Sequence, residues 1–521
     1  SEFAAAAVRR EIVEALLSVW GYLPEAIVTY LGDPMVWVML LAGTALGYFV
    51  GVMPGLGPTM GMALSLSIIY TLPVTQGMAL LIGIFVSAVG SGGITSSLIN
   101  IRVTAAAAAT GMDGYALVKQ GRGREACGYS VFASVIGTLA ATLFVFIIQP
   151  FVTTIALKFG DWETFLFCLF GLMICGSLSG DRPVKGWIAA FVGFFISMCG
   201  AESVQSVIRY NFGRSELLSG FNSTVAMLGL FGIGEVLYTL KNKQNTKVEG
   251  KAGLPIIKFQ EFGRNLANIV KSSLAGIWIG FIPGIGESAA CWFSYDIARR
   301  SSKKKELFGK GSPEGMIAAE VANNASSVGA LIPALSLGIP GSATVAIFIS
   351  AMYLMGYRPG PTLVMENPGI LCGICVLFFI AALGLLGIAY LASGLTIRLL
   401  SIPESLLMPM IAVFCAVGAY GTTNTPFSLI QLAFFGVLGL LMKVYHYPIA
   451  PLVLGMLVGN TADTCLRRAL TQYADNIGGM ILRPFGLGVM VALILVFILS
   501  IRSDKKSKAA SKESSGEQPV E

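Results

Sequence analysis

Long apolar runs, separated by short polar or glycine- and proline-rich stretches, dominate this chain of 521 residues. A membrane-spanning helix needs about 20 predominantly apolar residues. Runs that reach or approach this length occupy residues 35–53, 126–148, 163–178, 187–201, 221–240, 369–400 and 485–501. Shorter or interrupted apolar stretches occupy residues 59–70, 77–89, 94–110, 274–282, 288–298, 316–336, 342–355 and the pieces between 406 and 459. The pattern predicts roughly ten to fourteen membrane crossings, some of them discontinuous helices.

Composition narrows the class of protein further. Hydrophobic residues make up 55 % of the chain, charged residues make up 12 %, and the mean hydropathy is +0.76. Because a soluble domain carries about 25 % charged residues, an ordinary cytosolic enzyme, a nucleic-acid-binding protein and a disordered chain are excluded. The apolar residues form unbroken runs without alternation, which argues against a β-barrel. The predicted fold class is therefore an all-α polytopic membrane protein.

The distribution of charge predicts the orientation of the loops. The net charge is +7, and basic residues cluster at residues 119–124, 241–271, 299–310 and 502–512. Lys and Arg are enriched in cytoplasmic loops, so we place these segments inside, with a disordered cytoplasmic tail over residues 502–521. Few basic residues occur at 201–220, 357–368 and 418–426. These segments are expected to be outside loops or buried re-entrant ends.

Two interruptions of the apolar pattern resemble each other. Residues 51–58 read GVMPGLGP, and residues 280–287, which lie 229 positions later, read GFIPGIGE. Further along, residues 94–104 can be laid on residues 332–342. Matching helix breaks in two halves indicate internal repeats with broken helices and re-entrant hairpins. An inverted relation between the repeats needs an odd number of crossings between them, which the pattern does not settle, so inversion is expected by analogy alone.

The predicted organisation has five parts. Residues 1–34 form an amphipathic N-terminal segment on the membrane surface, and its first three residues are typical of a cloning remnant. Residues 35–240 form the first transmembrane repeat, and residues 241–271 form a basic cytoplasmic connection. Residues 272–501 form the second repeat, and residues 502–521 form the tail.

The Pro-Gly interruptions predict a site for an anion. Proline ends a helix and glycine leaves bare backbone, and unpaired backbone groups at membrane depth must face protein, water or a ligand. A new helix is expected to begin behind each turn, at Thr59 and at Ser288. A helix N-terminus carries about half a positive charge and free N–H donors, so both turns are candidate anion sites. The two hydroxyls suit N-caps or direct ligands.

Two further clusters of small and polar residues carry candidate chemistry. Residues 320–327 read EVANNASS, in which the adjacent Asn323 and Asn324 either contact a ligand or ion or form an interhelical hydrogen bond. Residues 338–344 read GIPGSAT, a second predicted helix break followed by hydroxyls. Its counterpart in the first half contains Gly and Ser at residues 90–93 and Asn100 and Thr104. The glycines of that stretch either pack helices closely or approach a ligand.

Titratable residues give fewer signals. The nine cysteines lie mostly in apolar runs, and Cys372 and Cys375 form a CxxC without a second pair, so we interpret them as packing residues. The single His446 cannot build a zinc site, and a proton-relay role is the alternative. No cofactor is predicted, apart from Na⁺ as a coupling ion. Charged residues within apolar stretches mark candidate functional positions, namely Arg102, Asp113, Glu235, Glu287, Asp296, Glu320 and Asp463.

These motifs together resemble the large membrane subunit of the tripartite tricarboxylate transporter family. The resemblance covers roughly residues 35–484 and rests on PGLGPT at 54–59, DGY at 113–115, IPGIG at 282–286, FGKGSPEG at 308–315, ANNA at 322–325, LGIPGSA at 337–343 and RPGP at 358–361. It implies Na⁺- or H⁺-coupled secondary transport of small di- or tricarboxylates, citrate-like compounds among them, by alternating access across a bacterial plasma membrane. It also implies two partners, a small membrane subunit and an extracytoplasmic binding protein. Contact with membrane lipid is expected, a homodimer is possible, and nucleic acid is excluded as a partner.

The motifs and the resemblance together give a set of expected site residues. Those expected to bind substrate are Gly55, Leu56, Gly57, Thr59, Asn100, Arg102, Gly284, Gly286, Ser288, Asn323, Asn324 and Ser342. Those expected to couple the ion are Glu287, Asn324, Ser327 and Thr344.

The chain departs from the family pattern at two positions. Where family members tend to read Asn-Ile-Pro-Gly-Thr, this chain has Arg102 and Val103 in place of Pro and Gly. The Arg102 guanidinium either holds a substrate carboxylate or pairs with a buried acid. Glu287 also replaces the expected small residue or proline, and it either pairs with Arg102, binds a cation or titrates.

Two other functions remain as alternatives. The first is a channel-like or scaffold subunit, which would pass substrate without coupling to a gradient. The second is an intramembrane enzyme, which would need a nucleophile–base or metal constellation that the sequence lacks. The sequence therefore predicts a transporter subunit rather than an enzyme.

Overall fold

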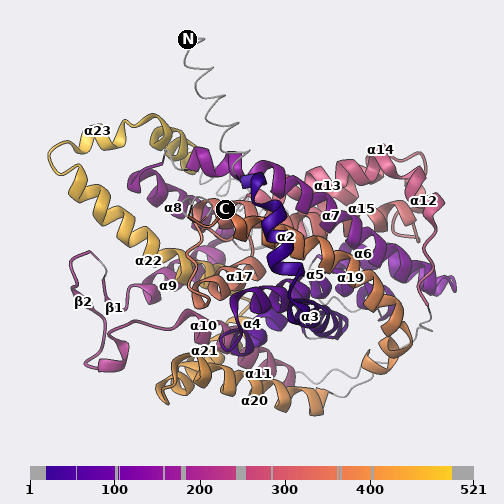
Figure 1. Cartoon of the computed structure of the whole chain (residues 1–521), viewed down its shortest axis with the longest axis horizontal. Helices are drawn as coiled ribbons and strands as arrows, with labels where there is room; N and C mark the ends of the chain where they lie inside the picture. Colours follow the sequence, from indigo (N-terminus) through magenta and orange to yellow (C-terminus); the bar gives the residue numbers. More distant parts are fainter. Residues whose placement is uncertain are drawn as a thin grey trace, which may run out of the picture. The chain divides into compact units, whose positions relative to one another are not determined.

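The structure is a computed structural model of the whole chain, and Figure 1 shows that it is built of helices with one short hairpin. The residues that it describes are 19–53, 56–99, 104, 106–156, 159–177, 183–202, 204–241, 254–282, 286–360, 363, 366–400 and 404–495. The fold class is thus the expected all-α membrane architecture. By packing, the chain divides into two compact units. Unit 1 comprises Ser1–Leu157 and Thr224–Leu440, and unit 2 comprises Lys158–Ser223 and Leu441–Glu521.

Unit 1 contains most of the helices. Its elements are α2 (Leu23–Leu31), α3 (Pro34–Val52), α4 (Pro58–Ile69), α5 (Val74–Ile99), α6 (Ala107–Lys119), α7 (Gly123–Ala156), α10 (Ser223–Met227), the π-helix η2 (Leu228–Ile233), α11 (Gly234–Lys241), α12 (Phe259–Arg264), α13 (Leu266–Phe281), α14 (Gly286–Ser301), η3 (Lys305–Leu307), α15 (Pro313–Gly329), α16 (Leu331–Leu337), α17 (Ala343–Leu354), α19 (Pro368–Leu400), α20 (Glu404–Thr423) and most of α21 (Phe427–Val444).

Unit 2 is smaller and contains the hairpin. Its elements are α8 (Asp161–Ser177), α9 (Pro183–Ser197), β1 (Gly200–Ala201), β2 (Ile208–Arg209), η1 (Ser215–Leu217), α22 (Ile449–Gln472) and α23 (Ile477–Ile481). The two strands pair antiparallel, with Gly200 opposite Arg209. Helix α22 packs against both α8 and α9.

The described helices include many that are long and apolar enough to cross a membrane. Eight reach at least 18 residues, and five shorter apolar helices are also present among the described residues. The chain is therefore a multi-pass membrane protein. The number of crossings and the orientation of the loops stay predictions. The boundaries of the two repeats also stay a prediction, because the two packing units divide the chain at other residues than the predicted repeats do.

One predicted interruption is wrong. The sequence pattern separated residues 77–89 from residues 94–110 at the glycines between them, but α5 runs through that stretch without a break and ends at Ile99. Glycine alone costs a helix only about 1 kcal/mol relative to alanine, and close packing on both sides offsets this. A Cβ on Gly90 would lie 2.5 Å from Leu385, and a Cβ on Gly93 would collide with the carboxylate of Glu320. Of the two interpretations, these glycines support close packing.

Glycines also allow close packing of α3 against α5 and of α13 against α15. A Cβ on Gly47 would lie 2.5 Å from the carbonyl oxygen of Ile84, and one on Gly276 would lie 2.7 Å from the carbonyl oxygen of Ala322. Gly47 and Gly276 are 229 residues apart, the same offset as between the two Pro-Gly interruptions. Each helix that precedes an interruption thus lies with its backbone directly on the long helix that follows. The same kind of contact thus recurs in both halves, and the two repeats stay a prediction.

Candidate functional site

A cavity of about 160 Å³ lies within unit 1, where several helices begin. Its lining comes from five helices and one connecting segment. The lining residues are Pro58, Thr59, Val89, Thr104, Ala106, Glu287, Ser288, Asn323, Ser327 and Thr344. Seven of these ten residues carry a hydroxyl, amide or carboxylate group, so the cavity is a polar chamber in an otherwise apolar protein.

Four helix N-termini meet at this cavity. Pro58 and Thr59 are the first residues of α4, Glu287 and Ser288 lie in the first turn of α14, Thr344 follows the first residue of α17, and Ala106 immediately precedes α6. The first turn of a helix has N–H groups without intrahelical partners and a partial positive charge. Four such ends at one chamber create a favourable environment for an anion, and none of the described lining residues is a lysine or an arginine.

Sequence features position these helix ends. Gly57 in extended backbone precedes Pro58, whose fixed φ suits the first position of α4. Gly286 begins α14 with φ +72°, a conformation that favours glycine. Ser342 caps α17 by accepting a hydrogen bond from Val345 N. Thr104 accepts one from Ala107 N at 3.0 Å, at the start of α6.

Hydroxyls from the two halves of the chain touch in the cavity wall. Thr59 Oγ1 lies 3.2 Å from Thr344 Oγ1, and either can be the donor. On α15, Ser327 Oγ donates to Glu287 Oε1 at 3.4 Å and also to the carbonyl oxygen of Asn323 at 3.0 Å. Asn323 is 4 % exposed and presents an amide, with both donor and acceptor atoms, to the same chamber.

The lining residues occur in pairs that follow the two offsets found in the sequence. Thr59 and Ser288 are 229 residues apart, whereas Ala106 and Thr344 are 238 apart, the offset that aligns 94–104 with 332–342. Val89 and Ser327 share this second offset. The cavity is therefore lined by residues that the sequence offsets pair between the two halves, and the second half supplies the more polar member at two of these three pairs.

The structure brings together six of the expected site residues: Thr59, Glu287, Ser288, Asn323, Ser327 and Thr344. Four more, Gly55, Asn100, Arg102 and Gly284, lie outside the described residues. The remaining five support the cavity without lining it, namely Leu56, Gly57, Gly286, Asn324 and Ser342. Asn324 Nδ2 donates to the backbone oxygen of Glu320 at 3.0 Å and to its Oε2 at 3.4 Å, so its amide is used within α15.

Four lining residues were not among the expected ones. They are Pro58, Val89, Thr104 and Ala106. The signal that could have identified Val89 and Ala106 is the repeat itself, because each is aligned with a hydroxyl residue of the second half. Among the described residues, no group of three or more His, Cys, Asp or Glu side chains could hold a metal ion.

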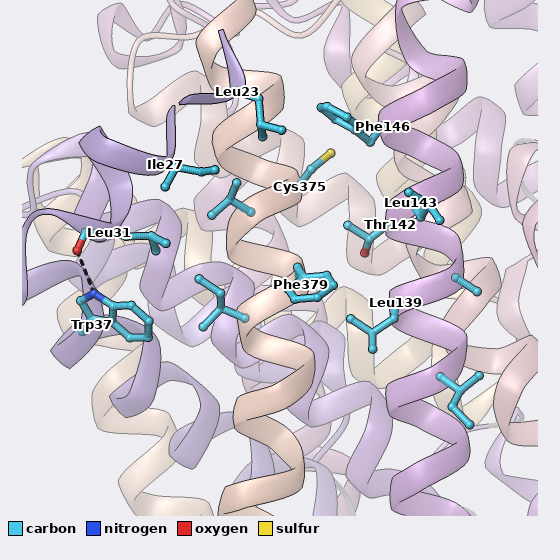
Figure 2. A pocket seen from close by; sticks show the side chains of 14 residues that line it. Leu23, Ile27, Leu31, Trp37, Leu139, Thr142, Leu143, Phe146, Cys375 and Phe379 are labelled. Carbon is cyan, nitrogen blue, oxygen red and sulfur yellow. Dashed lines mark hydrogen bonds between the residues drawn. The ribbon is translucent and has the colours of Figure 1, made fainter. Parts of the chain in front are cut away.

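A second, larger hollow of about 790 Å³ lies elsewhere in unit 1 and is apolar (Figure 2). Leu23 and Ile27 of α2, Leu143 and Phe146 of α7, and Phe379 of α19 are among its lining residues. The Trp37 indole N–H donates to the Leu31 carbonyl oxygen, as the dashed line in Figure 2 shows. Thr142 is its one hydroxyl residue, and that hydroxyl is bonded to the carbonyl oxygen of Thr138. Such an apolar surface suits contact with hydrocarbon chains, and none of its described lining residues carries a charge.

The fold and the polar cavity define a multi-pass membrane protein in which helix ends meet at a polar cavity, an arrangement also found in secondary transporters. The sequence matches the model of the tripartite tricarboxylate transporter TctA family over residues 37–454. The chain belongs to this family, which is the large membrane subunit of tripartite tricarboxylate transporters. Such systems also contain a small membrane partner and a periplasmic binding partner.

Two proteins of Agrobacterium vitis are similar to this chain. One, described as "Uncharacterized 52.8 kDa protein in TAR-I ttuC' 3'region", is 32 % identical over 473 residues, which cover 90 % of this chain and 94 % of that protein. The other, "Uncharacterized protein in TAR-II ttuC' 3'region", is 34 % identical over 236 residues, which cover 44 % of this chain and 97 % of that protein. No solved structure matches the chain.

Proposed function

We propose that this chain carries small di- or tricarboxylates across the bacterial plasma membrane by alternating access, driven by a Na⁺ or H⁺ gradient. In this proposal it works with a small membrane subunit and with a binding protein that delivers the substrate from outside. The C-terminal tail is cytoplasmic, and the two halves are inverted repeats around the central site. The convergence of four helix N-termini on one polar cavity carries the proposal.

The cavity has the chemistry that a carboxylate needs. Carboxylate oxygens accept hydrogen bonds, and the first-turn N–H groups with the hydroxyls of Thr59, Ser288 and Thr344 can donate them. A volume of about 160 Å³ is well below the size of typical drug-sized sites, which supports a small substrate. Among the lining residues that the structure describes, Glu287 is the one with an acidic or basic side chain. Because a carboxylate repels an anion, we assign it to a cation that binds next to the substrate.

Uptake by proteoliposomes tests the proposal. The chain is reconstituted with its co-expressed small subunit, and the binding protein is added with labelled citrate, succinate or acetate under imposed Na⁺ or pH gradients. We expect accumulation of a di- or tricarboxylate above its external concentration and a fall to equilibrium when both gradients are collapsed. Equilibration that is indifferent to both gradients would support the channel-like alternative. No gradient-dependent uptake of any carboxylate would contradict the proposal.

Ser288→Ala is the variant that links uptake to the cavity. It removes one donor from the first turn of α14 while leaving the backbone N–H groups in place. We expect the KM for the carboxylate to rise by about tenfold to a hundredfold, which corresponds to the loss of one hydrogen bond to a charged group. Ser301→Ala is a matched control on the same helix, because Ser301 is exposed and bonds the carbonyl oxygen of Ile297.

A further inference from the structure

We propose that Glu320, Thr110 and Ser130 bind a Na⁺ ion that is coupled to transport, at a site separate from the carboxylate cavity and from the cation that Glu287 holds beside bound substrate. This inference rests on the proposed function, because it names a coupling ion and its ligands. Glu320 lies in the middle of α15, Thr110 on α6 and Ser130 on α7. All three side chains are fully buried, with 0 % exposure.

Glu320 is a buried carboxylate without a cationic partner among the described residues. Two other buried helical carboxylates pair with arginine, Glu163 with Arg483 at 2.9 Å and Asp463 with Arg209 at 2.7 Å. The buried Asp113 instead accepts hydrogen bonds at both of its oxygens. Glu320 has no such arginine, and one of its oxygens has no hydrogen-bond partner among the described residues. A buried charge without compensation is very unfavourable in a medium of low dielectric constant. The neighbours of Glu320 are hydroxyl, amide and thiol groups, the last from Cys291 of α14. A small cation would supply the missing charge.

Three oxygen atoms here are buried without a hydrogen-bond partner among the described residues. They are Glu320 Oε1, Thr110 Oγ1 and Ser130 Oγ. Both hydroxyl side chains lie against the Glu320 carboxylate. Glu320 Oε2, in contrast, accepts hydrogen bonds from Ser134 Oγ at 3.0 Å and from Asn324 Nδ2 at 3.4 Å. One carboxylate oxygen is thus held in place by two hydrogen bonds, whereas the Thr110 and Ser130 hydroxyls interact with the carboxylate without a hydrogen bond of standard geometry.

Gly93 of α5 allows this arrangement. A Cβ at Gly93 would collide with Glu320 Oε1 and would lie 2.6 Å from Ser130 Oγ, so both oxygens lie against the bare backbone of α5. Any side chain at this position would displace the carboxylate. The missing Cβ therefore brings the helices together and also lets these two oxygens lie side by side.

The donor set favours Na⁺ over a proton. A proton is shared by two oxygens, whereas a hard cation collects several carboxylate and hydroxyl oxygens. Three unpartnered oxygens from three helices match the second description. The site also lies close to the cavity along the chain: Asn323 and Ser327 follow Glu320 by three and seven residues, so they lie on the same side of α15. A cation bound at Glu320 would therefore hold in place the side of α15 that lines the substrate cavity.

Thermal unfolding of the purified full-length chain in detergent tests the site without any carboxylate present. NaCl replaces KCl stepwise at constant ionic strength, and the midpoint temperature is followed. A ligand that binds only the folded state raises the midpoint by mass action. We expect the wild-type midpoint to rise with Na⁺, and we expect Glu320→Gln to remove the response. Ser130→Ala and Thr110→Val should each raise the half-saturating Na⁺ concentration by about tenfold.

Two control variants match the lost hydroxyls. Ser87→Ala and Thr153→Val also remove buried hydroxyls that have no hydrogen-bond partner among the described residues, but at positions outside this cluster. Both should keep the wild-type Na⁺ response. If Glu320→Gln does not fold, the two hydroxyl variants decide the question.

Three results would overturn the inference. They are a wild-type midpoint that ignores Na⁺, a midpoint that responds to pH in place of Na⁺, and an unchanged Na⁺ response in the hydroxyl variants. None of these would affect gradient-driven carboxylate uptake by the wild type, which is the readout for the proposed function. The two proposals can therefore fail separately.

Discussion

Thr59 Oγ1 and Thr344 Oγ1 lie 3.2 Å apart although 285 residues separate them in the chain. Each threonine occupies the second position of its helix, α4 or α17, directly behind a glycine- and proline-containing turn. Their contact joins the first half of the chain to the second at the wall of the polar cavity. The pair thus links the halves and places two hydroxyls in the lining of the cavity.

Valine at either position should weaken carboxylate binding with little effect on folding. Valine keeps the β-branched shape and removes the hydroxyl, so we expect the KM for uptake to rise by about tenfold in Thr59→Val and in Thr344→Val. The double variant should be less impaired than the product of the two effects, because the hydroxyls are in contact. Thr142→Val, which removes a hydroxyl bonded within α7, is the control. Multiplicative effects of the two substitutions would show that the hydroxyls act independently.

Asp113 should matter for stability rather than for uptake affinity. Its Oδ1 accepts hydrogen bonds from Gly311 N at 2.9 Å and Ser312 N at 2.8 Å, and Tyr295 donates to its Oδ2 at 2.8 Å. Asp113→Asn should therefore lower the free energy of unfolding by about 1.5–3 kcal/mol. The measurement is chemical denaturation in detergent.

The control for Asp113 is an exposed aspartate. Asp296 forms an ion pair with Arg300 at the protein surface, with its side chain 49 % exposed. Exposed pairs of this kind contribute little, so Asp296→Asn should leave the unfolding curve unchanged. Equal effects of the two substitutions would contradict the role assigned to Asp113.

Alanine at Gly47 or Gly276 should disrupt both halves in the same way. A Cβ would press on the carbonyl oxygen of Ile84 in one half and of Ala322 in the other. Overpacking of this kind costs about 1–3 kcal/mol, and we expect a lower midpoint temperature together with slower uptake in each variant. Gly387→Ala is the control, because a Cβ there meets nothing within 4 Å. A loss confined to one of the two variants would argue against equivalent packing in the two halves.

Glu202 should make unit 2 sensitive to acid. It lies next to β1, outside the apolar spans, and burial raises the pKa of its carboxyl. Hydrogen bonds from the backbone of the following loop and the charge of Arg467 outweigh that effect, so the pKa is lowered overall. A lowered pKa in the folded state stabilises the protein above the unfolded pKa of about 4.5, and this stabilisation is lost as the pH falls through the folded value.

The pH dependence of thermal unfolding checks this prediction. The wild-type midpoint should fall as the pH drops below about 4.5, and Glu202→Gln should reduce that fall because glutamine does not titrate. At neutral pH the variant should be less stable than the wild type. A variant with the same acid sensitivity as the wild type would assign that sensitivity to other carboxyl groups.

The sequence by itself determined the class of protein, the family and the position of the helix breaks at proline-containing turns. Long apolar runs force helices in a membrane, because backbone groups there must pair within their own segment. Proline and glycine then end helices at fixed points, so the starts of α4, α14 and α17 followed from the sequence. The glycines at 90–93 misled the prediction, because a glycine ends a helix only when the tertiary context leaves its backbone unsupported.

The tertiary structure alone decided which polar residues share one space. Asn323 and Asn324 are adjacent and chemically identical, yet one lines the cavity and the other bonds Glu320, because a step of one residue turns the side chain by about 100° around the helix. The contact between Thr59 and Thr344 and the oxygens around Glu320 likewise depend on helices brought together from distant parts of the chain. Local sequence fixes where a helix begins, whereas the packing of whole helices fixes what its first turn and its faces meet.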